Sequence, residues 1–257
     1  MIIIGIIYHG SSEHNLKKIE PRKSTHGQYV YATPEKVLAI HFSKRCGDDL
    51  TYDIGHFSSK EGPWELVENI PMVLEKMYDN NSSIYSIDDK TFKDIHTGFC
   101  EVASEESVDV INEEYYENLY DEILNLEKEG LIKIYRYPNK PNRMTKTSIL
   151  DKYRFYKERL NKVYTKKDFD RLVYLHPEIL NEINALAKEF ELDFEYSIND
   201  LVDLFKNRVD MQIYDSSHEQ YIDCAYQNII NNFPNLKEII DLEYNKYLES
   251  IQNKKTK

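Results

Sequence analysis

The sequence predicts an α+β fold in its first half and an all-α region after it. In residues 1–140, short runs of β-branched and aromatic residues alternate with clusters of Gly, Pro, Asn and Asp, which is the pattern of short strands joined by turns. In residues 142–253, apolar residues recur with the 3.6-residue period of amphipathic helices. The segment Pro138–Asn142 interrupts both patterns, so we predict two domains, 1–140 and 141–257.

The composition is that of a soluble globular chain, with 257 residues, 41% hydrophobic and 30% charged. No apolar run approaches the roughly 20 residues that a membrane span needs. Residues 1–7 lack the basic start and the cleavage site of a signal peptide. Three widely spaced cysteines are typical of reduced thiols rather than of a disulfide framework or a zinc site. We therefore expect a cytoplasmic protein without a membrane or metal partner.

The formal net charge of −12 is unevenly distributed. Residues 1–140 carry 15 Lys and Arg against 25 Asp and Glu, whereas residues 141–171 carry 10 against 4. An acidic chain with one basic segment argues against general coating of nucleic acid. The basic segment surrounds an apolar stripe, which is usual for a solvated helix face, and contact with phosphate or RNA is the alternative.

The first predicted strand, Ile2–Ile7, is followed by the residues Tyr8-His9-Gly10-Ser11. A histidine beside a residue without a Cβ lets a flat ligand approach the main chain closely. A second strand is predicted at Gln28–Ala32. A helix then begins with Thr33 as N-cap and Pro34 at the first helical position.

These segments (Tyr8 to Ser11, then Val30 to Pro34, then Ala39 and Phe42) resemble the NAD-binding core of ADP-ribosyltransferase-like proteins of the diphtheria-toxin and poly(ADP-ribose) polymerase type. The resemblance covers the N-terminal half only. It implies an ADP-ribosyltransferase-like split β-sheet core, in which two small sheets form a cleft and NAD binds as the substrate.

The resemblance also implies roles for single residues of the motif His9-Gly10-Ser11. His9 would bond the adenosine-side ribose, and the backbone of Gly10 would hold the nicotinamide carboxamide. Tyr31, or Tyr29 on the same strand face, would stack on the nicotinamide ring.

Arg22 could neutralise the pyrophosphate of NAD. Each of these assignments has a purely structural alternative. His9 could be a strand-end histidine bonded to the backbone, Arg22 could be a surface arginine, and most of the 21 tyrosines must serve packing.

The resemblance further implies a catalytic acid on or just before a late core strand, which we predict at Ser107–Ile111. Glu101, within the sequence FCEVAS, is the first candidate and Glu106 is the second. Such a carboxylate would hold a ribose hydroxyl and stabilise the positive charge that develops as the glycosidic bond breaks. A solvated surface carboxylate is the alternative for each.

The remaining elements are predicted from periodicity and capping signals. Val73–Tyr78 is either a strand or a helical turn, Ser83–Ile87 is a strand, and Gly130 ends a helix over Glu113–Leu126. A strand at Leu131–Tyr135 follows. The later helices are predicted over Ser148–Tyr164, from Thr165 with Asp168 at N3, from Pro177, from Ser197, from Ser217 with Gln220, and over Asn235–Ile251.

The leading functional hypothesis is NAD-dependent ADP-ribosyl transfer, or NAD glycohydrolysis, with release of nicotinamide. The acceptor would be protein, nucleic acid or water. The alternative is a non-catalytic module that binds NAD or ADP-ribose, or that binds another protein through its helices. A phosphotransferase that moves an RNA 2′-phosphate to NAD ranks lower, because only Arg22 and Lys23 provide positive charge near the motif.

Overall fold

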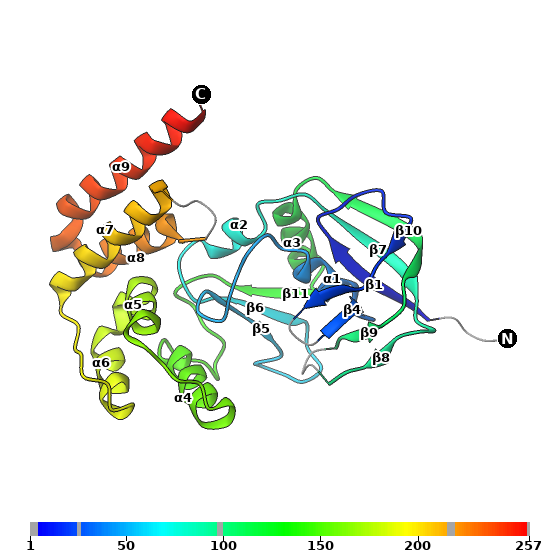
Figure 1. Cartoon of the computed structure of the whole chain (residues 1–257), viewed down its shortest axis with the longest axis horizontal. Helices are drawn as coiled ribbons and strands as arrows, with labels where there is room; N and C mark the ends of the chain where they lie inside the picture. The colour runs from blue at the N-terminus through cyan, green and yellow to red at the C-terminus, as the bar shows by residue number, and fades with distance from the viewer. Residues whose placement is uncertain (1–4, 25–26, 97–99, 215–218, 256–257) are drawn as a thin grey trace. The chain divides into compact units, whose positions relative to one another are not determined.

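The computed structural model describes residues 5–24, 27–96, 100–214 and 219–255 (Figure 1). The fold is mixed α/β, with antiparallel sheets and C-terminal helices. The chain forms two compact units, each built from two separate segments. Unit 1 consists of Met1–Cys46 and Leu74–Lys133, and unit 2 of Gly47–Val73 and Ile134–Lys257. The sequence predicts one domain boundary near residue 140, whereas each compact unit combines two separate segments of the chain. The two domains, 1–140 and 141–257, stay a prediction.

Unit 1 contains two four-stranded antiparallel sheets among its described residues, with the orders β1-β7-β10-β2 and β3-β4-β9-β8. Between the two sheets lies a cluster of buried side chains that includes Ile7, Val30 and Ile87. The strands are β1 (Ile6–Ser11), β2 (Lys18–Ile19), β3 (Arg22–Ser24), β4 (Gly27–Ala32), β7 (Ser82–Asp88), β8 (Lys93–Asp94), β9 (Val102–Ser104) and β10 (Val108–Tyr116).

Strand β1 ends later than the sequence pattern predicts. Its ladder with β7 runs from Ile6↔Asp88 to Ser11↔Ser83, so His9 and Gly10 lie within the strand instead of beyond its end. The antiparallel partner continues the ladder through these polar residues, which a hydrophobicity pattern does not reveal. Residues 2–4 of the predicted strand lie outside the described residues.

Helix α1 (Lys36–Phe42) begins after Glu35, so the prediction that Thr33 is the N-cap is wrong. The backbone of Thr33 instead exchanges two hydrogen bonds with Tyr8 of β1, at 2.8 and 2.9 Å. The Thr33 hydroxyl accepts a bond from the Glu35 N–H, which closes a local turn before the helix.

Gly10 allows α1 to pack directly against β1. A Cβ at this position would overlap the carbonyl oxygen of Ala39 and would lie 2.9 Å from the Cβ of Ser43. Ala39 is buried in the middle of α1, and Ser43 follows the helix. The absence of a side chain at Gly10 therefore has a packing role besides the predicted role toward a ligand.

The predicted helix over Glu113–Leu126 is wrong at its start, because Glu113–Tyr116 continue β10 opposite β7. Helix α3 (Leu119–Lys128) is capped by Asn118, whose side chain accepts the N–H of Tyr120 at 2.9 Å. The prediction that Gly130 ends this helix is confirmed. Gly130 has φ +75° and donates to Glu127, as in a Schellman motif. The segment Val73–Met77, which the sequence left open, is helical (α2).

Unit 2 contains β5, β6, the second half of β11 and the helices that follow Pro141, and the three strands form a sheet of order β11-β6-β5. The predicted capping box of Thr165 and Asp168 is present, whereas Ser217 lies outside the described residues. The elements are β5 (Tyr52–Gly55), β6 (Trp64–Glu68), β11 (Ile132–Tyr135), α4 (Ser148–Leu160), α5 (Lys166–Leu175), the 3₁₀ turn η1 (Pro177–Ile179), α6 (Leu180–Glu189), α7 (Ile198–Tyr214), α8 (Ile222–Asn232), the 3₁₀ turn η2 (Pro234–Leu236) and α9 (Lys237–Lys255).

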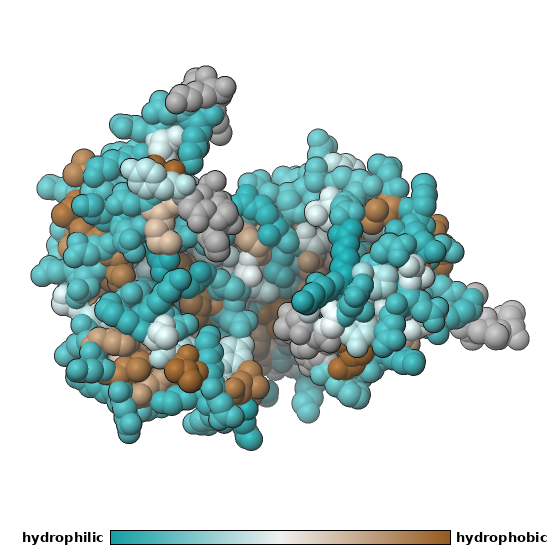
Figure 2. All heavy atoms as spheres, viewed as in Figure 1, coloured by the Kyte–Doolittle hydropathy of each residue, from teal (hydrophilic) through white to brown (hydrophobic). Residues whose placement is uncertain are grey.

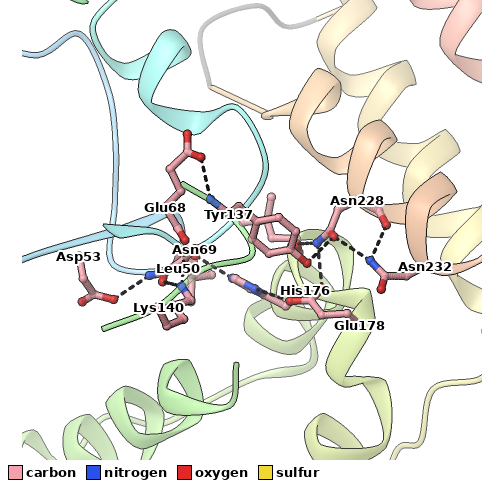
Figure 3. A network of polar contacts seen from close by, with 11 residues as sticks. Leu50, Asp53, Glu68, Asn69, Tyr137, Lys140, His176, Glu178, Asn228 and Asn232 are labelled. Carbon is pink, nitrogen blue, oxygen red and sulfur yellow. Dashed lines mark hydrogen bonds and ion pairs between the residues drawn. The ribbon is translucent and has the colours of Figure 1, made fainter. Parts of the chain in front are cut away.

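A buried polar network explains why the strand segment belongs to the helical unit (Figure 3). The Tyr137 hydroxyl donates to Asn228 of α8 at 2.9 Å, while the Tyr137 N–H donates to Glu68 of β6 at 3.0 Å. Nε2 of His176 contacts the carbonyl oxygen of Leu50 at 2.7 Å. Asn228 is fully buried, so these bonds satisfy groups that would be costly to leave unpaired. Outside such buried regions, the face in Figure 2 is mainly hydrophilic, with apolar side chains in small separate groups.

Gly10→Ala should destabilise the protein by about 1–3 kcal/mol, because the new methyl group overlaps the α1 backbone, which cannot move away cheaply. Denaturant unfolding followed by circular dichroism measures the effect. Gly62→Ala is the control, since its Cβ would meet no atom closer than 3.6 Å. Equal stability of the two variants would show that β1 and α1 are not packed this closely.

Candidate functional site

One cavity of unit 1, here cavity 1, has a volume of about 680 Å³, which is in the range of small-molecule and cofactor pockets. The first sheet contributes β1, β2 and the loop between them, and the second sheet contributes β3 and β4. The segment after α1 completes the wall. The lining residues are His9, Gly10, Ser11, Ser12, Glu13, Leu16, Lys18, Ile19, Glu20, Arg22, Ser24, Tyr29, Val30, Tyr31, Phe42, Ser43, Lys44, Arg45 and Asn80.

Cavity 1 brings together six of the predicted site residues. They are His9, Gly10, Ser11, Arg22, Tyr29 and Tyr31. The other two, Glu101 and Glu106, are not among its lining residues. The predicted binding residues thus share one cavity, and the predicted catalytic acids lie outside its wall.

The imidazole of His9 is held in one tautomer by the neighbouring strand. Its Nδ1 lies 2.7 Å from the carbonyl oxygen of Tyr31 on β4. A carbonyl oxygen can only accept, so Nδ1 carries the proton. No described residue bonds Nε2. In the neutral ring this atom is an acceptor, suited to a hydroxyl group of a ligand.

Burial keeps His9 neutral, since it lowers the pKa of the imidazole below the ordinary value of 6.5. The bond to Tyr31 raises this pKa, and the nearby positive charge of Arg22 lowers it. Burial is the largest of these effects. Around neutral pH the ring therefore donates through Nδ1 and accepts through Nε2.

Tyr29 and Tyr31 project from the same face of β4, as side chains two residues apart in a strand must. Their ring centroids are 5.9 Å apart at an angle of 84°, an edge-to-face contact. The Tyr31 hydroxyl and Oδ1 of Asn80 are buried without a hydrogen-bond partner among the described residues. Buried polar atoms are normally bonded, so both are suited to contact a polar ligand.

The charge of the cavity 1 wall is opposite in sign to that of the chain. The wall carries four basic residues, Lys18, Arg22, Lys44 and Arg45, and two acidic residues, Glu13 and Glu20. The whole chain, by contrast, has a net charge of −12. A locally basic cavity in an acidic protein favours an anionic ligand.

Lys44 and Arg22 are the two cations whose environment is best defined. Burial lowers the pKa of Lys44 to about 8, while the negative charges near it, including Glu101, raise it. Arg22 forms an ion pair with Glu13 at 2.7 Å, and both side chains are exposed. Such exposed pairs are weak, so Arg22 can exchange Glu13 for an anionic ligand at little cost.

The two predicted acids sit at opposite ends of β9. Glu101 is half-buried immediately before the strand, and β9 pairs with β4 through Tyr31↔Ala103. Its carboxylate acts on Lys44 of the cavity wall, because it raises the pKa of that ammonium group. Glu106 is exposed in the turn after β9, where its N–H donates to the Ser104 hydroxyl.

The loop between β1 and β2 is anchored by Glu113 of β10. One carboxylate oxygen of Glu113 accepts bonds from the Asn15 N–H at 2.9 Å, the Ser83 hydroxyl at 2.6 Å and the Tyr85 hydroxyl at 3.0 Å. These bonds lower the pKa of Glu113. They hold Ser12, Glu13 and Leu16 in the wall of cavity 1.

Sequence reasoning missed the part of the wall that follows α1, Ser43–Arg45, and it missed Asn80. The sequence did contain a signal for the residues after α1. Gly10 implies a close neighbour, and α1 is the next helix in the chain. The basic pair Lys44-Arg45 then falls beside the strand that carries His9. No local pattern marks Asn80, whose side chain reaches the carbonyl oxygen of Ser43.

Comparisons with protein-family models, with curated proteins and with solved structures gave no match. Among the described residues, no group of three or more His, Cys, Asp or Glu side chains is arranged to hold a metal ion. No helix within the described ranges has the length and apolar character to cross a membrane. The assignment of cavity 1 therefore depends on its own geometry.

Arg22→Ala should raise the pKa of His9, because it removes a positive charge that disfavours the imidazolium. The pKa should stay below 6.5, since burial, the larger cause, is unchanged. An NMR titration of the His9 ring measures both values. Lys23→Ala is the control, because it removes an adjacent exposed charge that does not act on His9. A pKa unchanged by Arg22→Ala would contradict the placement of Arg22.

Proposed function

We propose that cavity 1 binds NAD and that the protein releases nicotinamide from it, by ADP-ribosyl transfer or NAD glycohydrolysis. The observation that carries the proposal is the imidazole of His9. Its Nδ1–H is committed to Tyr31, and its Nε2 is left as an acceptor at a cavity of suitable size and charge. A ribose hydroxyl is the donor that such an acceptor fits.

The rest of the wall supports a dinucleotide ligand. Arg22, Lys44 and Arg45 provide positive charge for a pyrophosphate. The rings of Tyr29 and Tyr31 provide apolar faces for a flat heterocycle. The backbone of Gly10 and the unpartnered Oδ1 of Asn80 are suited to an amide group such as the carboxamide of nicotinamide.

In the reaction, the bond between the nicotinamide nitrogen and C1 of its ribose would break, and nicotinamide would leave as a neutral molecule. The acceptor would form a bond to C1 and lose its proton. A carboxylate close to this ribose stabilises the developing positive charge. We assign this role to Glu101, with Glu106 as the second candidate, and closure around the ligand would have to bring the carboxylate to the ribose.

One observation favours a second candidate function, a module that binds NAD or ADP-ribose without turnover. Glu101 and Glu106 do not line cavity 1, and the two carboxylates that do are engaged. Glu13 pairs with Arg22, and Glu20 accepts a bond from the Ser107 hydroxyl. Turnover distinguishes the two functions.

Incubation of the purified protein with NAD should release nicotinamide, measured by liquid chromatography. His9→Ala should abolish the release, while His96→Ala, at an exposed position of unit 1 outside cavity 1, should not change it. Glu101→Gln should slow the release about 10²-fold or more if its charge stabilises the transition state.

Unchanged NAD consumption in both Glu101→Gln and Glu106→Gln would exclude these residues as the catalytic acid. Saturable NAD binding without release would support the non-catalytic module. Neither binding nor release would refute the proposal as a whole.

The affinity for NAD should fall as the pH is lowered through the pKa of His9, below 6.5, because protonated Nε2 cannot accept a hydroxyl proton. Above that pKa the His9 contribution is fully present. Calorimetric titrations at several pH values measure the change, with the fluorescence of Trp64 as a check that the fold persists. An affinity for NAD that rises with acidity in the wild type would contradict the role of His9 as acceptor.

Glu13→Gln should strengthen NAD binding about two- to fivefold, because it frees Arg22 and removes a negative charge from the wall. The dissociation constant from the same titrations measures this. Glu129→Gln, at an exposed position of unit 1 outside cavity 1, should leave the affinity unchanged. Weaker binding in Glu13→Gln would mean that Glu13 itself contacts the ligand.

A further inference from the structure

A second cavity, here cavity 2, lies entirely within unit 2 and has a volume of about 370 Å³. One side is the loop Asp48–Leu50, which precedes β5. The other side is formed by α4, the connection from α4 to α5, and α5. Three tyrosines line it, namely Tyr153, Tyr156 and Tyr164.

The aromatic wall of cavity 2 consists of packed and hydrogen-bonded tyrosine side chains. The rings of Tyr153 and Tyr164 stack with centroids 4.5 Å apart at an angle of 13°, and both side chains are buried. The Tyr153 hydroxyl is bonded to the carbonyl oxygen of Asp168 at 3.1 Å. On the loop side, the hydroxyl of Tyr156 donates to the carboxylate of Asp49. Cavity 2 thus combines aromatic faces with the carboxylate of Asp49.

The charges around cavity 2 leave this carboxylate without a counter-ion. Arg171 pairs with Asp48, Lys152 with Asp53 at 2.7 Å, and Lys162 with Asp168 at 4.0 Å.

Asp49 has no cationic partner among the described residues. Burial raises the pKa of Tyr164 to about 12, and the negative charges of Asp168 and then Asp49 add to this effect. The lining of cavity 2 carries three carboxylates and three cations, but Lys152 pairs with Asp53, which lies outside the lining. Within the described part of the chain, Asp49 is therefore left without an ion-pair partner, in a place where aromatic rings add further negative potential.

The position of Asp49 is fixed by its neighbours. His176 holds the next residue, Leu50, through its carbonyl oxygen at 2.7 Å (Figure 3). Lys152 donates to the carbonyl oxygen of Asp49 at 2.6 Å and also pairs with Asp53, which in turn accepts a bond from Asn69 at 2.8 Å. The carboxylate is therefore presented by an anchored loop, which favours a preformed site.

Tyr164 has a buried hydroxyl group and a ring that is covered by a lysine side chain. Its hydroxyl is buried without a hydrogen-bond partner among the described residues, in a side chain only 7% exposed. The ammonium group of Lys162 lies over its ring, 4.8 Å from the centroid, and the Lys162 side chain is half exposed. An alkylammonium group of the protein itself already occupies this aromatic face, and solvent access lets it move aside.

We propose that cavity 2 binds the ammonium group of an aliphatic amine. Asp49 is the counter-ion, Tyr156 and Tyr164 supply aromatic faces, and the Tyr164 hydroxyl accepts an N–H of the ligand. Lys162 competes for the same ring and is displaced when the ligand binds. This inference is independent of the function proposed for cavity 1.

The probe that tests the role of charge is choline, compared with its uncharged isostere 3,3-dimethylbutan-1-ol in calorimetric titrations of the full chain. Choline should bind saturably with a stoichiometry of one, and the alcohol at least tenfold more weakly. Asp49→Asn should weaken choline binding at least tenfold. Asp193→Asn, which removes an exposed carboxylate elsewhere in unit 2, should not. Equal binding of choline and the alcohol, or an unaffected Asp49→Asn, overturns the proposal.

Two more variants keep the test valid if Asp49→Asn folds poorly. Lys162→Met should strengthen choline binding severalfold, because it removes the competing ammonium group. Unchanged or weaker binding would show that Lys162 does not compete with the ligand. Tyr164→Phe should raise the melting temperature without ligand, since it deletes an unpartnered buried hydroxyl. It should weaken n-butylammonium binding more than tetramethylammonium binding, because only the former donates an N–H. Equal effects overturn the role of the hydroxyl.

The ammonium group could belong to a free amine or to a lysine side chain of another protein. Comparable affinities for n-butylammonium and for Nα-acetyl-lysine amide assign the site to free amines. An affinity at least tenfold higher for the lysine derivative assigns it to a lysine side chain. Absence of saturable binding for every ammonium probe overturns the proposal.

Discussion

Cavity 1 depends on the junction of β1 with β4. β1 pairs along its whole length with β7 in the first sheet, and at Tyr8 it exchanges two backbone hydrogen bonds with Thr33, at the end of β4 in the second. The bond from His9 to Tyr31 is the side-chain part of the same junction. It simultaneously fixes the distance between the sheets and the tautomer of His9. The junction therefore contributes to both the geometry and the chemistry of the cavity, and packing of α1 on Gly10 places the basic residues that follow the helix beside it.

Electrostatics separates cavity 1 from the rest of the protein. Most of the chain is acidic, yet four basic residues converge on this cavity from two regions of the sequence, Lys18 with Arg22 and Lys44 with Arg45. Burial disfavours the charged form of Lys44 and lowers its pKa to about 8. An anionic ligand would offset that cost. The weak pair of Arg22 and Glu13 at the exposed side is consistent with a site that binds and releases a charged molecule.

Unit 2 follows a different principle, in which buried polar groups connect segments that are distant in sequence. Asn228 bonds to Tyr137, and His176 bonds to Leu50, so the strand segment is held to the helices by directed bonds (Figure 3). Such bonds define position more strictly than apolar packing does, because a displaced partner leaves a buried polar atom unpaired. The loop that carries Asp49 gains its fixed position in this way. In both cavities, a buried tyrosine hydroxyl without a partner marks the wall, Tyr31 in one and Tyr164 in the other.

The sequence by itself determined the elements that depend on local chemistry. Strand β4, the capping box at Thr165 and the helix end at Gly130 were predictable, because alternation, side-chain caps and positive φ are properties of a few neighbouring residues. It also predicted six residues that line cavity 1. Only the tertiary structure decided the start of α1, the extension of β10 through Glu113, the placement of Lys44 and Asn80, and the grouping of Gly47–Val73 with the helices. These features depend on pairing and packing between residues far apart in the chain, and no local pattern records such partners.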